Sequence, residues 1–227
     1  MKKTLLLVLA LMTGNAHASV IINGTRVVFS HDAKEASFQL INRSPTTHLV
    51  QSWIDDGQIE ASPEEIDVPF VILPPIVKIG PENGQEIKIR RVGDTHHIAK
   101  DRESVFWINV LDIPPIPDGA ERGEQNYLQV ALRTRIKLFY RPAGLDASEE
   151  FVGQNLSVNV AGNCLENRSP LHVSVVDMEK DNQRILEQSF MIKPFSCHVV
   201  DGVTLDHSGQ YKVVWLDDYG SKKSVLL

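Results

Sequence analysis

Short stretches in which apolar and polar residues alternate recur along the first part of the chain, separated by Gly, Pro, Asn or Ser. Alternation with a period of two is typical of half-buried β-strands. No stretch shows a convincing helical period, so about seven strands are expected before residue 142. These stretches lie at residues 20–29, 36–40, 48–54, 70–73, 87–90, 105–111 and 127–140.

The last of these stretches is the longest. From Tyr127 to Tyr140 one face carries leucine, valine, threonine and isoleucine, and the other carries glutamine, alanine, arginine and lysine. A strand of this length would extend on the order of 45 Å, beyond the usual limit of about ten residues. Part of it is therefore expected to project past its own domain. Pro142 ends it, because proline cannot donate to a ladder, and residues 141–144 are expected to form a hinge.

After the hinge the alternation resumes in shorter runs at residues 156–160, 171–176, 185–192, 197–200, 211–216 and 224–227. The pattern predicts an all-β protein of two immunoglobulin-like β-sandwich domains. The first spans residues 19–141 and the second, smaller domain spans residues 142–227. The polar, glycine-containing loop at 118–124 precedes the long strand and is expected to be mobile.

Residues 1–18 are predicted to be a secretory signal peptide rather than part of the fold. Lys2 and Lys3 precede an apolar run too short to span a bilayer, and residues 16–18 read Ala-His-Ala, a small-x-small cleavage site. Cleavage is expected after Ala18, and no other segment is apolar enough for membrane insertion.

Export also bears on Cys164 and Cys197, the only two cysteines. They are expected to form a disulfide, with two buried thiols as the alternative.

Composition and motifs argue against several functions. The formal net charge of −6 disfavours nucleic acid as a partner. There is no nucleophile elbow, no phosphate-binding glycine loop and no zinc-protease motif. His96 and His97 have no third ligand nearby in sequence, so no metal site is expected. We predict a protein that is not an enzyme and needs no cofactor.

Three motifs together resemble the periplasmic pilus (fimbrial) chaperones, the PapD-like family. They are residues 136–142, Ile-Lys-Leu-Phe-Tyr-Arg-Pro; residues 101–104, Asp-Arg-Glu-Ser; and residues 113–115, Ile-Pro-Pro. The resemblance covers the whole chain after the signal peptide. It implies two sandwich domains at an angle with a cleft between them, and donation of a strand to an incomplete pilus subunit.

The resemblance also implies an anchor for the carboxylate at the end of the subunit chain. In this family an arginine on the first strand and a lysine near the end of the long strand reach into the cleft. Arg26 and Lys137 occupy these positions. Both are alternatively ordinary surface cations, as most Arg and Lys residues are.

Leu128, Val130 and Leu132 match the family's donor residues, which enter a groove of the subunit in steps of two. The alternative is that this row packs in the protein's own core. Lys137 is an odd number of residues from Leu132, so a regular strand puts them on opposite faces and only a bulge or strong twist would realign them.

A charged cluster between the domains is the third implied feature. Arg90, Glu103 and Asp218 match the family positions, and the resemblance implies ion pairs that set domain orientation. Arg91 stands where the family has an apolar residue, which leaves open which arginine pairs.

The sequence thus predicts a periplasmic chaperone that binds, folds and caps pilus subunits and delivers them to the outer-membrane usher. The modest loop at 118–124 resembles the short-loop branch of the family. The exposed apolar row also allows self-association of the free protein. The alternative is a secreted two-domain adhesive or structural protein without chaperone activity, which would not form a stable complex with a smaller exported subunit.

Overall fold

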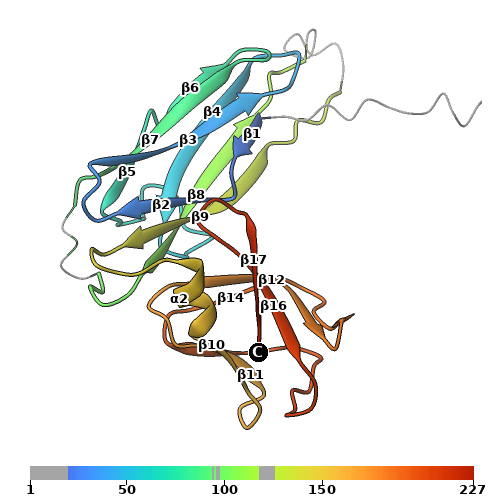
Figure 1. The fold of residues 1–227 in the computed structure, drawn as a ribbon. Coiled ribbons are helices and arrows are strands. Elements are labelled where there is room, and N and C mark those ends of the chain that lie inside the picture. The colour runs from blue at the N-terminus through green and yellow to red at the C-terminus, as the bar shows by residue number, and fades with distance from the viewer. Residues whose placement is uncertain (1–19, 94, 96–97, 118–125) are drawn as a thin grey trace, which may run out of the picture.

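The computed structural model describes residues 20–93, 95, 98–117 and 126–227. The predicted signal peptide, the His96–His97 pair and the whole 118–124 loop lie outside the described residues. The chain is nearly all β and forms two domains, one stacked on the other (Figure 1). Each domain has its own apolar core, the first built from residues between 20 and 140 and the second from residues between 152 and 215.

Two sheets pack face to face in the first domain. The first sheet has the order β1 (Val20–Asn23), β3 (Glu35–Asn42), β7 (Gly84–Arg91), β5 (Phe70–Leu73). The second has the order β2 (Arg26–Ser30), β9 (Leu132–Arg141), β8 (Ser104–Ile113), β4 (His48–Asp55), β6 (Ile76–Ile79). Alternate residues of both sheets point inward, and Leu40, Ile87, Ile108 and Leu138 are fully buried between them.

Among the described residues the domain has nine strands where the sequence predicted about seven, because the stretch 20–29 forms two strands in different sheets and β6 was not predicted. Gly24 has a φ of 116°, which lets the chain pass from β1 in one sheet to β2 in the other. Pro74 and Pro75 separate β5 in one sheet from β6 in the other, because neither proline has an N–H that could continue a strand ladder. β2 then pairs in parallel with β9.

The second domain is a smaller sandwich. One sheet has the order β10 (Leu156–Asn159), β11 (Cys164–Asn167), β15 (Ser196–Val199). The other has the order β13 (Gln183–Arg184), β12 (Val173–Lys180), β16 (Tyr211–Leu216), β17 (Lys222–Leu226), with β14 (Phe190–Ile192) also pairing with β12. Cys164 and Cys197 form a disulfide that links the neighbouring strands β11 and β15.

The second domain also contains one short helix that the sequence did not predict. α2 (Glu149–Gln154) follows the domain junction, and the Ser148 hydroxyl accepts a hydrogen bond from the Phe151 N–H at 3.3 Å. Glu149 and Glu150 lie in its first turn, where the helix dipole favours negative charge. At six residues the helix is too short to show a periodic pattern in the sequence.

Candidate functional site at the domain junction

Arg26 and Lys137 lie side by side at the junction of the two domains. The parallel ladder between β2 and β9 places Arg26 directly opposite Lys137. Both side chains point to the second domain: Arg26 Nη1 donates to the Leu216 carbonyl at 3.1 Å, and Lys137 Nζ donates to the Ser174 hydroxyl at 3.0 Å. Two cations that are 111 residues apart in the sequence therefore share one site.

The surroundings of this pair disfavour its positive charge. Burial, together with repulsion from Arg26, lowers the pKa of Lys137 to about 8. Burial also lowers the pKa of Arg26, although the carboxylates of Asp218, Asp217 and Glu103 act against it. The Arg26 Nε atom is buried and has no hydrogen-bond partner among the described residues. Neither cation forms an ion pair within that part of the chain, so an incoming carboxylate would supply the missing counter-charge.

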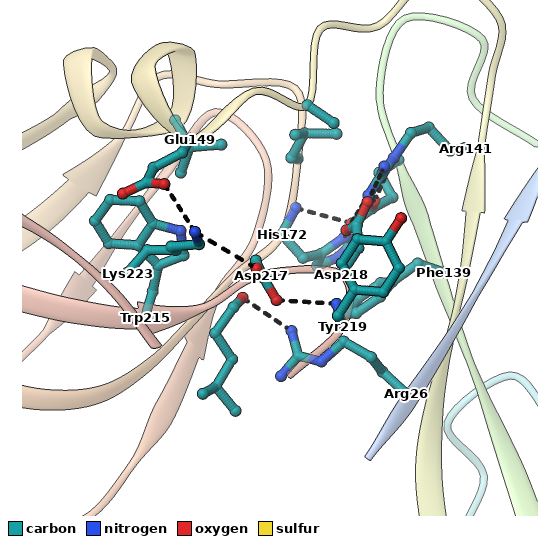
Figure 2. A pocket seen from close by; sticks show the side chains of 15 residues that line it. Arg26, Phe139, Arg141, Glu149, His172, Trp215, Asp217, Asp218, Tyr219 and Lys223 are labelled. Atoms are coloured by element: carbon teal, nitrogen blue, oxygen red, sulfur yellow. Dashed lines mark hydrogen bonds and ion pairs between the residues drawn. The ribbon is translucent and has the colours of Figure 1, made fainter. Parts of the chain in front are cut away.

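A cavity of about 220 Å³ opens beside Arg26, between the two domains (Figure 2). Its walls combine ionic groups with the apolar side chains of Phe139, Val152, Leu171 and Trp215. The Arg26 guanidinium also lies 5.9 Å from the centre of the Phe139 ring. The site therefore offers charge and apolar surface together.

The ion-pair network between the domains is centred on Arg141. Its guanidinium binds Glu103 Oε2 at 2.8 Å and Asp218 Oδ2 at 2.6 Å, from the first and the second domain respectively. Glu103 Oε1 in turn accepts hydrogen bonds from the His172 backbone N–H at 3.0 Å. Burial alone would lower the pKa of Arg141, but the bonds to Asp218 and Glu103 raise it above its ordinary value.

Arg90 does not take part in this network, which corrects the sequence-based expectation. Ile89 points into the core, so Arg90 points outward from β7 and meets Glu35 on the neighbouring strand at 3.2 Å. Arg91 Nη1 contacts the His31 carbonyl at 3.3 Å. Sequence reasoning placed Arg141 in the hinge and assigned it no partner. Two features of the sequence could have pointed to Arg141. It stands beside the hinge proline, and the two predicted acidic residues, Glu103 and Asp218, required a cationic partner.

The predicted donor residues are exposed. Leu128, Val130 and Leu132 keep 87%, 65% and 55% of their surface accessible, so they do not pack in the protein's own core. The ladder begins only at Leu132, which lies opposite Asp112 near the end of β8. The strand thus begins later than the predicted 127, because β8 ends before Pro114 and no other described strand pairs with residues 126–131.

The long strand needs no bulge to place Lys137. Pairing between β8 and β9 is regular from Leu132 to Tyr140. Ile136 and Leu138 therefore enter the core, whereas Lys137 lies on the other face, toward the second domain. Lys137 is an odd number of residues from Leu132 because the two residues lie on opposite faces of the strand.

One edge of β9 is open beside the donor residues. β2 covers this edge only from Lys137 onward, so among the described residues positions 132–136 pair with β8 alone. A groove of about 630 Å³ follows the edge and runs from Leu132 to Lys137. An extended chain in this groove would end at the two cations.

A buried carboxylate on the outer face of the same sheet was not foreseen. The Asp55 side chain is fully buried and binds Arg135, the Asn109 amide at 2.7 Å and the Gly57 N–H at 2.7 Å. Burial raises the pKa of Asp55, but these hydrogen bonds outweigh it and lower the pKa below its usual value. Arg135 also lies over the Trp107 ring at 4.3 Å. These contacts stabilise β9 next to its open edge.

The described part of the chain offers no candidate membrane-spanning helix and no candidate metal site. It contains no helix with the length and apolarity needed to cross a bilayer. Nor do its residues include a group of three or more His, Cys, Asp or Glu side chains placed to hold a metal ion.

Comparison with known proteins identifies the family. Residues 19–146 match the family described as "Pili and flagellar-assembly chaperone, PapD N-terminal domain", and residues 152–225 match "Pili assembly chaperone PapD, C-terminal domain". The probable fimbrial chaperone YehC of Escherichia coli is 37% identical over 97% of this chain and 91% of its own.

Solved structures agree in fold. The CupB2 chaperone of Pseudomonas aeruginosa is 29% identical and superimposes with a TM-score of 0.77 over 91% of this chain and 98% of its own. The SafB chaperone of Salmonella enterica, solved with the SafA pilin, has a TM-score of 0.77 at 22% identity, over 94% and 98% of the two chains. With both domains matched in sequence and in fold, this chain belongs to the PapD-like family of pilus assembly chaperones.

Proposed function

We propose that this protein is a periplasmic chaperone of a chaperone–usher pathway. It binds, folds and caps pilus subunits by donating a strand, and it delivers them to the outer-membrane usher. The observation that carries the proposal is the continuity of one surface. An exposed apolar row at residues 128–132 leads along an open strand edge to two partly buried cations that have no counter-ion among the described residues.

The cations suit the terminal carboxylate of a subunit. A carboxylate accepts several charge-assisted hydrogen bonds, each worth about 1.5–3 kcal/mol. Arg26 and Lys137 are held by rigid strands and already partly desolvated, so little reorganisation accompanies binding. Because the carboxylate is the last group of the chain, anchoring it sets the register of the residues before it along β9.

The apolar row suits an incomplete sandwich. A subunit that lacks one strand exposes an apolar groove and two unpaired strand edges. Residues 126–136 would supply main-chain hydrogen bonds to these edges, and alternate side chains would enter the groove. Each of Leu128, Val130 and Leu132 contributes about 1.5–3 kcal/mol if it becomes fully buried.

In this proposal the ion pairs of Arg141 hold the two domains, which both contribute to the site, in a fixed arrangement. Arg26 and Lys137 belong to the first domain, whereas Leu216 and Ser174, which they contact, belong to the second. A stable angle between the domains therefore keeps the anchor sheltered. Relatives support a pilin as the partner, since SafB was solved with the SafA pilin and CsuC with the CsuE tip subunit.

A pull-down from periplasmic extract tests the proposal. Tagged wild-type protein is expected to retain a pilin-like subunit, identified by mass spectrometry. Arg26→Ala and Lys137→Ala are expected to lose the subunit while remaining folded. Arg43→Ala and Lys78→Ala serve as matched controls, because both side chains are exposed and lie away from the junction. If the wild type recovers no subunit where pilus subunits are expressed, the adhesive-protein alternative takes its place.

A further inference from the structure

Tyr219 is the most exposed large side chain of apolar character in the described residues. Its side chain is 93% accessible, although it lies at the rim of the same cavity that Arg26 lines (Figure 2). It comes from the turn between β16 and β17, which reaches toward β2 and β9 (Figure 1). Within the described part of the chain, no hydrogen bond, ion pair or ring contact involves the Tyr219 side chain.

The turn that carries Tyr219 is held rigidly. Asp217 Oδ1 accepts the backbone N–H groups of Tyr219 at 2.9 Å and Ser221 at 2.8 Å. The next residue, Asp218, binds Arg141 through both carboxylate oxygens. The backbone at Tyr219 is thus tied to both domains, which fixes the place from which the ring projects.

That place is beside the anchor. Gly220 has a φ of 81°, and a Cβ atom there would lie 3.3 Å from the hydroxyl of Thr25, the residue before Arg26. The turn therefore packs directly against the start of β2. Among the described residues the buried Arg26 Nε has no hydrogen-bond partner, and the cavity that Arg26 and Tyr219 both line has ionic groups as well as apolar side chains in its walls. Single exposed apolar side chains are common, but an exposed ring on a fixed turn, beside a cation that forms no ion pair among the described residues, is a binding arrangement.

We propose that Tyr219 is a specificity-determining residue for subunit capture, with its ring packing on the side chain of the subunit's last residue. The inference rests on the proposed function, because it takes the carboxylate of that residue to lie on Arg26 and Lys137. It adds a preference: chain ends with an aromatic or large aliphatic side chain bind better than chain ends with glycine. An aromatic contact of this kind corresponds to about two- to tenfold in affinity.

Two synthetic peptides that differ only in their last residue, phenylalanine or glycine, test the preference. Both carry the last strand of a co-purified subunit and a free carboxylate, and affinity for the full mature protein is measured by fluorescence anisotropy. The wild type is expected to prefer the phenylalanine peptide by about two- to tenfold. Tyr219→Ala should lose the preference, and Tyr219→Phe should keep it because the hydroxyl makes no contact in this role.

Leu226→Ala is the matched control, since Leu226 is also exposed and lies on the adjoining strand away from the cavity. It should keep the preference. The inference is overturned if Tyr219→Ala still prefers phenylalanine, or if it weakens both peptides equally, as a merely structural role would.

A third peptide with an amidated end separates this inference from the proposed function. Binding that depends on the free carboxylate but shows no phenylalanine preference overturns the role of Tyr219 alone. Equal binding of the amidated and free peptides overturns the carboxylate anchor, and with it the inference. Wild-type protein that binds none of the three peptides contradicts both.

Discussion

At the scale of single residues, Lys137 combines partial burial with a neighbouring cation. Both disfavour its proton, and its pKa falls to about 8 in the free protein. A bound carboxylate has the opposite effect and raises the pKa again. Capture of a subunit above this pH therefore requires uptake of a proton at Lys137, whereas below it the lysine is already charged.

The affinity for a subunit peptide should accordingly be nearly constant from pH 6.5 to about 8. Above that it should fall by up to about tenfold per pH unit, because the free protein loses the proton that the complex keeps. A peptide titration over this range measures the slope. Lys137→Arg is the control and should bind with little change across it, since arginine stays charged. A wild-type affinity that stays constant up to pH 9.5 would contradict this account.

At the scale of elements, the donor segment is an exposed continuation of β9 rather than part of its ladder. In the residues described, the segment 126–131 pairs with no strand, and a hydrogen bond from Gln129 Nε2 to the Pro114 carbonyl at 2.7 Å ties it to the end of β8. Changes to its apolar side chains should therefore affect binding and leave stability alone.

Val130→Arg tests this separation. The arginine would enter an apolar groove of the subunit, so affinity should fall by more than about tenfold. The melting temperature should not change, because Val130 is 65% exposed. Val92 has the same exposed fraction and lies outside the proposed surface, so Val92→Arg is a close control. Unfolding of the Val130 variant alone would show that the row belongs to the protein's own core.

The disulfide is the other feature at this scale. It joins β11 to β15 across 33 residues of sequence. In the chain-entropy view, the double variant Cys164→Ser, Cys197→Ser should lose roughly 3–4 kcal/mol of unfolding free energy. Denaturant titration measures the loss, and reduction of the wild type should produce a similar one. A loss below about 1 kcal/mol would mean that the cross-link hardly restricts the unfolded chain.

At the scale of the whole molecule, a largely buried ionic cluster joins the two domains. The Glu103 side chain is 1% exposed; it forms an ion pair with Arg141 and accepts a hydrogen bond from the His172 N–H. The Glu35 side chain, which pairs with Arg90, is 38% exposed. Breaking a buried pair leaves an uncompensated charge, while breaking an exposed pair leaves one that water solvates.

Glu103→Gln should therefore destabilise the protein by about 3 kcal/mol and broaden the distribution of domain angles. Glu35→Gln should change neither by a measurable amount. Denaturant titration reports the stability, and small-angle scattering reports the radius of gyration. Equal effects of the two substitutions would mean that Arg141 and its partners do not control domain orientation.

The local pattern of residues in the sequence was sufficient to predict much of the secondary structure and the family of this protein. Alternation identified most of the strands and the all-β class, and the motifs at 101–104, 113–115 and 136–142 pointed to the family. These features depend on neighbours in the chain, because a period of two acts on the residues beside it.

Tertiary structure decided the rest, since it depends on which distant residues meet. The sequence could not show that β2 pairs in parallel with β9 and so sets Arg26 opposite Lys137, or that Arg141 rather than Arg90 joins Glu103 to Asp218. It could not show that Tyr219 stands beside Arg26. Sheet order, register and the packing of two domains determine these contacts, and none of them is encoded in local periodicity.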